Sequence, residues 1–153
     1  MKIPYLTARA RAPLPSLGGS IIRPRPVLAV LLAGPGRARL LDGLLDTGSD
    51  DTVFEEGVAS ILGTNLANTP ERQVGLAGRA QPVRCRYASV QMRITDGLQE
   101  TYEWTALIGF VATPLRYALL GYAGFLQFFD ITFYGLAREV ILSANASFPG
   151  RRI

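Results

Sequence analysis

Residues 44–54 read Leu-Leu-Asp-Thr-Gly-Ser-Asp-Asp-Thr-Val-Phe, and they constrain the fold more than any other stretch. The apolar run Leu40–Leu45 predicts a buried strand that delivers one carboxylate, that of Asp46, into a turn. Gly48 lets other backbone approach this turn closely, because it carries no side chain. The apolar approach is expected to remove water from Asp46, which favours a role in proton transfer over one in solubility.

Three interpretations of this stretch compete. An ordinary acidic turn is the first, since Asp, Gly and Ser are common turn residues. A calcium loop is the second, but it requires oxygen ligands at its third position and an acid at its twelfth, where this chain has Gly48 and Gly57. The third is the active-site loop of an aspartic protease. Residues 44–56 resemble the retropepsin family, the aspartic proteases of retroviruses and their bacterial relatives, almost residue for residue.

The length of the chain limits how such a site could be completed. With 153 residues, one domain is expected, which is too short for a two-lobed enzyme with two Asp-Thr-Gly loops. The sequence has one such loop and no internal repeat, so a second aspartate must come from a second copy. The absence of histidine excludes Ser-His and Cys-His nucleophiles and histidine-bound metals, and a lone Cys85 excludes an internal disulfide. No metal and no cofactor are implied.

The charges favour neither nucleic acid nor membrane as a partner. The chain has 16 basic and 12 acidic residues, and its arginines are spread along the sequence without interleaved aromatic residues. From Trp104 to Phe129 only Arg116 is charged, but Pro114 and Arg116 interrupt this run, so two buried strands and a short helix explain it better than a membrane span. Prolines interrupt the N-terminus where a signal peptide would be apolar. A soluble, cytoplasmic protein is expected.

The chain divides into three parts. Residues 1–24 are rich in proline and arginine and predict a flexible arm, although Ile3, Tyr5 and Leu6 could add a strand to a partner's sheet. Residues 25–145 predict the folded domain, and residues 146–153 predict a tail. Within the domain, short apolar runs separated by turns indicate an all-β fold. The pattern also predicts a helical turn ending at Gly63 and a bulge near Ala88-Ser89.

The resemblance implies a particular architecture: a single-lobe retropepsin-like barrel with one short C-terminal helix, closed as a homodimer. The helix is expected over residues 122–129, after Leu119-Leu120-Gly121, whose glycine lets a strand pass behind the active-site loop. A hairpin over residues 130–143 is expected to pair with the second copy, which would remove an open sheet edge. Arg25 is expected to pair with Asp50 across the dimer interface.

The resemblance also implies the site residues and the reaction. Asp46, Thr47 and Gly48 are expected to form the catalytic loop of an endopeptidase that activates water with two aspartates and acts on polypeptides. Ser49 is expected to donate a hydrogen bond to ionised Asp46. A weak or inactive peptide-binding or structural dimer of the same fold is the alternative. The expected substrate-binding residues, which include the tip of a mobile flap hairpin, are Ser49, Asp50, Asp51, Val53, Gly75, Leu76, Ala77, Gly78, Leu115 and Leu119.

Overall fold

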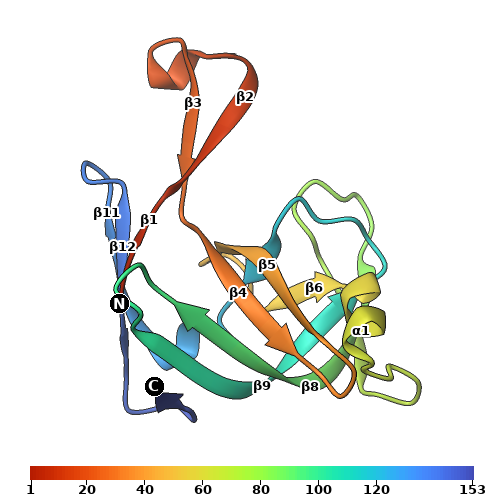
Figure 1. Ribbon diagram of the computed structural model, residues 1–153. Coiled ribbons are helices and arrows are strands. Elements are labelled where there is room, and N and C mark those ends of the chain that lie inside the picture. Colours follow the sequence, from red (N-terminus) through yellow and green to blue (C-terminus); the bar gives the residue numbers. More distant parts are fainter.

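The computed structural model describes residues 1–153 and consists mainly of β-strands (Figure 1). Its single α-helix, α1, spans Glu56–Leu62. The predicted all-β class is confirmed. The strands are β1 (Lys2–Pro4), β2 (Leu6–Leu14), β3 (Ser20–Arg25), β4 (Val27–Ala33), β5 (Ala38–Leu45), β6 (Val53–Glu55), β7 (Glu71–Val74), β8 (Val83–Thr95), β9 (Thr101–Val111), β10 (Ala118–Leu120), β11 (Phe129–Tyr134), β12 (Glu139–Ala144) and β13 (Arg151–Arg152).

The largest sheet closes on itself. Its strands follow the order β13-β9-β6-β10-β5-β4-β8-β7, and β8 also pairs with β9. The strands β9, β6, β10, β5, β4 and β8 therefore form a closed ring, with β7 and β13 attached to it. Two of these pairings are parallel, β10 with β5 and β6 with β9, and both flank the loop that follows β5. A closed ring has no open edges, so the predicted barrel forms within one chain.

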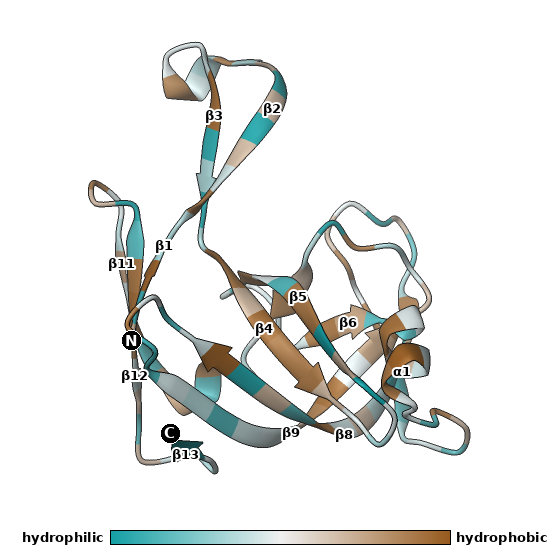
Figure 2. Cartoon of the chain, in the orientation of Figure 1, coloured by the Kyte–Doolittle hydropathy of each residue, from teal (hydrophilic) through white to brown (hydrophobic).

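The interior of the domain has two clusters of buried side chains. The larger contains 24 residues, and its bulkiest fully buried members are Phe54, Phe110 and Phe125. The smaller consists of Val53, Val74, Cys85 and Val111. Figure 2 shows that β4 and β6, which supply residues to these clusters, are mainly hydrophobic along their length. Burial of each large apolar side chain stabilises the fold by about 1.5–3 kcal/mol.

Strand β8 is regular, so the bulge predicted near Ala88-Ser89 is wrong. Its register with β9 runs without a shift from Cys85 to Thr95. Successive residues of a strand face opposite sides of the sheet. Cys85 packs in the smaller cluster, whereas Ala88 and Val90 pack in the larger one on the opposite side. The imperfect alternation in the sequence arises because β8 buries each of its faces in turn.

The predicted C-terminal helix over residues 122–129 is also wrong. Only a single 3-10 turn, η2 (Leu126–Phe128), forms there. Gly124 has a φ of 90°, which breaks the helical path, and Phe125 and Phe129 are both buried in the core. The predicted turn ending at Gly63 is confirmed, and it is the α-helix of the fold. Gly63 caps α1 with a φ of 71°.

Residues 1–24 form strands where a flexible arm was expected. Strand β1 pairs antiparallel with β12, and the amino group of Met1 donates to the carbonyl oxygen of Leu142 at 3.0 Å. Strands β2 and β3 form a hairpin that projects from the body of the protein (Figure 1), with a 3-10 turn, η1 (Pro15–Leu17), at its tip. The start of the arm is ordered by pairing with a segment that is distant in sequence, and the rest is ordered as a local hairpin.

The predicted hairpin near the C-terminus is confirmed as β11 and β12. The other edge of β12 is covered by β1 of the same chain, so that edge needs no second copy.

Residues 146–153 are packed on the domain and do not form a free tail. Arg151 and Arg152 pair with β9 as strand β13, and the guanidinium of Arg151 donates to Glu103 at 2.9 Å. The ring of Phe148 lies edge-on to Tyr102 and Trp104. No helix in the structure has the length and apolar character needed to cross a membrane.

Candidate active site

The Asp-Thr-Gly loop follows directly from β5. The N–H of Asp46 donates to the carbonyl oxygen of Leu120 at 3.1 Å, which ties the start of the loop to β10. The N–H of Ser49 donates to the carbonyl oxygen of Asp46 at 3.1 Å, which closes a tight turn. The side chain of Asp46 is half-buried, as expected for a carboxylate at the end of an apolar strand.

The segment after β10 holds this loop from behind, as predicted. A Cβ atom at Gly121 would lie 2.2 Å from the carbonyl oxygen of Asp51 and 2.7 Å from that of Ser49. The N–H groups of Tyr122 and Ala123 donate to the carbonyl oxygens of Ser49 and Asp50 at 2.9 and 2.8 Å. Only glycine permits this backbone approach, so Gly121 fixes the path of the loop.

The side chains of Asp46 and Ser49 in this loop do not bond to each other. Oδ1 of Asp46 accepts a hydrogen bond from the N–H of Gly48 at 3.0 Å. The hydroxyl of Ser49 donates to the carbonyl oxygen of Asp51 at 2.8 Å. The expected donation from Ser49 to Asp46 is therefore wrong, because the proton of Ser49 is used to hold the loop backbone. Thr47 is exposed in the single chain.

Asp51 connects the loop to the β7–β8 hairpin. Its Oδ2 accepts a hydrogen bond from the hydroxyl of Tyr87 on β8 at 2.8 Å and lies 2.9 Å from the guanidinium of Arg72 on β7. Burial, together with the hydrogen bond to Asp51, raises the pKa of the Tyr87 phenol. The negative charge of Asp51 raises the pKa of Arg72. Local sequence patterns do not predict this network, because its members come from three separate segments.

Removal of the Tyr87 hydroxyl is expected to change how stability depends on alkaline pH. A folded-state pKa above the ordinary value of 10.0 means that Tyr87 contributes stability below that pH and loses it as the pH rises further. In Tyr87→Phe, the free energy of unfolding should therefore fall less between about pH 8 and about pH 11 than in the wild type. Urea denaturation at both pH values measures this difference. An equal fall in the free energy of unfolding of the two proteins would contradict a raised pKa for Tyr87.

A groove of about 430 Å³ collects three parts of the chain around Asp46. The first is the Asp-Thr-Gly loop, the second is the tip of the β7–β8 hairpin, and the third is the segment before β10 that begins Thr113-Pro114. At the hairpin tip, the N–H of Arg79 donates to the carbonyl oxygen of Leu76 at 3.0 Å. The lining residues are Arg25, Leu44, Asp46, Gly48, Ser49, Gly75, Leu76, Ala77, Arg79, Thr113, Pro114, Leu115, Arg116, Tyr117 and Leu119.

Most, but not all, of the expected site residues line this groove. The expected residues that line it are Asp46, Gly48, Ser49, Gly75, Leu76, Ala77, Leu115 and Leu119. Val53 does not, because it is buried in the smaller cluster, on which Leu76, Leu115 and Leu119 pack. Asp51 is held in the network with Arg72 and Tyr87. Thr47, Asp50 and Gly78 are exposed on the single chain and lie outside the lining.

Sequence reasoning missed the polar residues of the groove. Arg79, Arg116 and Tyr117 line it, and the Tyr117 ring centroid lies 5.5 Å from the guanidinium carbon of Arg116 and 5.9 Å from that of Arg25. Contacts at this distance favour a cation over an aromatic face. The only available signal was the position of Arg116 and Tyr117 one residue beyond the Thr113-Pro114 pair.

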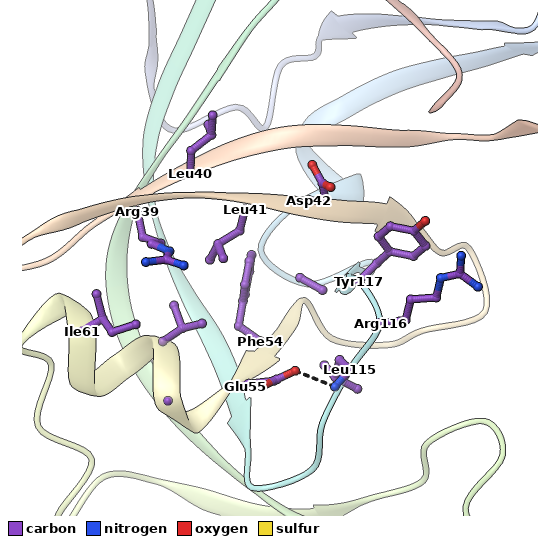
Figure 3. Close-up of a pocket in the computed structure, with 13 residues that line it drawn as sticks. Arg39, Leu40, Leu41, Asp42, Phe54, Glu55, Ile61, Leu115, Arg116 and Tyr117 are labelled. Carbon is purple, nitrogen blue, oxygen red and sulfur yellow. Dashed lines mark hydrogen bonds between the residues drawn. The ribbon is translucent and has the colours of Figure 1, made fainter. Parts of the chain in front are cut away.

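A larger cavity of about 580 Å³ lies on the other side of the segment 115–117 (Figure 3). It is bounded by β5, α1 and this segment, and Asp46 does not reach it. Figure 3 shows Glu55 directed at Leu115, whose N–H donates to Oε1 at 2.7 Å. This bond fixes the wall between the two cavities. The smaller groove remains the candidate site because it contains the carboxylate of the Asp-Thr-Gly loop, whereas the carboxylate of Glu55 in the larger cavity is bonded to the wall.

No protein-family model matches the chain. No curated protein matches it either. Among solved structures, the chain is similar to EIAV protease complexed with the inhibitor HBY-793, with a TM-score of 0.40 and 22% sequence identity. The similarity covers 63% of this chain and 81% of that one. At this level the match does not establish a family, and function is inferred from the residues of the site.

Within one chain, the groove contains a single carboxylate and a buried hydrogen-bond donor that no acceptor satisfies. Asp46 is the only acidic side chain that lines it. Nε of Arg25 is buried and makes no hydrogen bond. A buried donor without a partner is costly and uncommon in folded proteins.

Proposed function

We propose that this protein is a retropepsin-like aspartic endopeptidase that acts as a homodimer. The observation that supports this most strongly is the placement of Asp46, in its Asp-Thr-Gly loop, inside a groove covered by a hairpin tip. The loop is held by backbone hydrogen bonds and by the close approach of Gly121. A carboxylate held in this way by fixed backbone is prepared for catalysis.

In the proposed dimer, Asp46 of each copy faces the other across a two-fold axis. Two carboxylates at such short range cannot both ionise, so they share one proton. The ionised aspartate takes a proton from a water molecule, whose oxygen attacks the scissile carbonyl carbon. The protonated aspartate donates its proton to the carbonyl oxygen, which gives a tetrahedral species with two hydroxyl groups. The aspartate that took the water proton then donates it to the nitrogen, the other aspartate takes a proton from one hydroxyl group, and the C–N bond breaks to leave a carboxylic acid and an amine. No covalent bond to the enzyme forms.

Other loop residues are assigned to the dimer. The exposed hydroxyl of Thr47 is free to bond with the loop of the second copy and to fix the two carboxylates. Asp50 is exposed, and Arg25 has a buried Nε without a partner, so we assign them to each other across the interface. This pairing satisfies the buried donor that the single chain leaves unpaired.

The hairpin tip at Gly75–Gly78 is assigned the role of a flap. Leu76 and Ala77 line the groove, and their neighbours Gly75 and Gly78 leave the backbone unobstructed. A flap that closes over a peptide excludes water and offers main-chain hydrogen bonds. The network of Asp51 with Arg72 and Tyr87 anchors the base of this hairpin to the catalytic loop.

Digestion of a denatured protein mixture tests the proposed function directly. The purified protein is incubated between about pH 4 and about pH 7, the range over which aspartate dyads change protonation. New peptides are then identified by mass spectrometry. Cleavage by the wild type, and none by Asp46→Asn, is expected. Absence of cleavage at every pH would defeat the protease assignment and favour a peptide-binding or structural dimer.

Reversal of the charge at Arg25 is expected to dissociate the dimer. In Arg25→Glu, a second acid would face Asp50 of the other copy, and repulsion replaces attraction. Sedimentation velocity at matched concentrations should show a shift from dimer toward monomer. Arg37→Glu, which changes an exposed arginine outside the groove, is the control and should leave the distribution unchanged. No shift in Arg25→Glu would refute the pairing.

A further inference from the structure

The arginines are dispersed along the sequence, but several of them gather in space next to the groove. A cavity of about 490 Å³ beside the β2–β3 hairpin is lined by Arg9, Arg11, Arg23 and Arg116. Arg116 also lines the groove that contains Asp46, together with Arg79. The two cavities therefore lie next to each other and share Arg116 in their linings. We call these five residues the arginine surface: Arg9, Arg11, Arg23, Arg79 and Arg116.

The positive charge of the arginine surface is not neutralised within the chain. None of its five residues takes part in an ion pair, whereas Arg72, Arg86, Arg93, Arg151 and Arg152 all do. Residues 1–41 contain no aspartate or glutamate, so the projecting hairpin carries positive charge only. No acidic residue lines the cavity beside the hairpin. A concave surface with charge of one sign attracts ligands of the opposite sign.

We propose that the arginine surface selects polypeptide substrates with an acidic segment next to the cleaved bond. This inference rests on the proposed function, because a peptide that lies in the groove reaches the hairpin cavity past Arg116. Guanidinium groups pair with carboxylates through two parallel hydrogen bonds. The β2–β3 hairpin, residues 6–25, has no aromatic side chain on which a base could stack. A polypeptide therefore fits this surface better than a single-stranded nucleic acid.

Matched peptides test this selectivity. One cleavable core, taken from the digestion experiment, is extended by four Glu, four Gln or four Lys residues, at either end in separate peptides. The full-length protein should cleave a Glu-flanked peptide with a kcat/KM about tenfold above that of its Gln-flanked counterpart, as expected for several exposed ion pairs. The Lys-flanked peptide should be the poorest. The preference should shrink as potassium chloride is added, because salt screens exposed charges.

Two variants of equal charge locate the effect. In Arg9→Gln/Arg11→Gln/Arg23→Gln, the ratio of kcat/KM for Glu-flanked over Gln-flanked peptide should fall toward one. The control is Arg37→Gln/Arg84→Gln/Arg138→Gln. These three arginines form no ion pair and line neither the groove nor the hairpin cavity, so this variant should keep the wild-type ratio. Equal cleavage of the two peptides by the wild type, or an unchanged ratio in the hairpin variant, overturns the proposal.

A binding measurement separates this inference from the proposed function. The Asp46→Asn chain is titrated against fluorescein-labelled Glu-flanked and Gln-flanked peptides, and anisotropy reports binding. Stronger binding of the acidic peptide, lost in the hairpin variant, supports the arginine surface even if no cleavage is found. Binding of a single-stranded oligonucleotide of equal charge more tightly than the acidic peptide overturns the proposal. Dissociation of a dimer in the hairpin variant also overturns the proposal, because that result would mean that the arginine surface binds a second copy.

Discussion

A chain with Asp46→Asn is expected to lose peptide hydrolysis by about a thousandfold or more, because the dyad then lacks a base. The variant should still fold. Asparagine has the shape of aspartate, and its side-chain oxygen can accept the hydrogen bond that the N–H of Gly48 donates to Oδ1. Initial rates on a peptide from the digestion experiment measure the loss. The control is Asp130→Asn, which neutralises an exposed acid on β11 and should cleave at the wild-type rate.

Mixing the two chains then tests whether both copies supply the aspartate. If wild type and Asp46→Asn exchange partners freely in equal amounts, half of the wild-type chains enter mixed dimers. The activity per wild-type chain should then fall to about half. Addition of Asp130→Asn in place of the inactive variant should not lower it. Unchanged activity in the first mixture would mean that one copy of Asp46 suffices.

Gly121→Ala is expected to destabilise the fold by about 3 kcal/mol and to remove activity with it. The new Cβ would lie 2.2 Å from the carbonyl oxygen of Asp51, which is backbone and cannot rotate away. The segment after β10 or the catalytic loop must therefore move. Urea denaturation measures the loss of stability, and peptide hydrolysis measures the displacement of the loop.

Gly57→Ala is the matched control for this substitution. Gly57 lies in α1, and a Cβ there meets no atom within 4 Å. Alanine is the better helix former by about 1 kcal/mol, so this variant should be slightly more stable than the wild type. If Gly121→Ala proved as stable and active as Gly57→Ala, the tight backbone approach would not hold the loop.

Local sequence patterns predicted much of this fold. Alternating short apolar runs indicated an all-β domain, and Gly63 marked the end of the helical turn that became α1. The path of Gly121 behind the loop was implied by the resemblance of Leu119-Leu120-Gly121 to the retropepsin pattern, and the structure places Gly121 there. Each of these inferences depends on residues that are near one another in the chain.

The errors arose where distant segments meet. The first residues of the N-terminal arm become ordered through a strand more than a hundred residues away, which their proline-rich surroundings did not indicate. The aromatic run after Gly121 was interpreted as a helix, but Phe125 and Phe129 are buried in the core and Gly124 breaks the helix. The hydroxyl of Ser49 had two possible acceptors, and only the folded loop distinguishes them.

The pairing of β1 with β12 in one chain affects the kinetics of the proposed enzyme. Because β1 covers one edge of β12, that edge is closed to a second copy, and the contacts proposed for the dimer are the catalytic loops and Arg25 with Asp50. A dimer held by these contacts alone buries less surface than one that also pairs strands, so it dissociates on dilution. The rate per chain would then rise with enzyme concentration, and the velocity would be second order in enzyme when it is scarce. Such a protein would be inert when newly made and would become active where its copies accumulate.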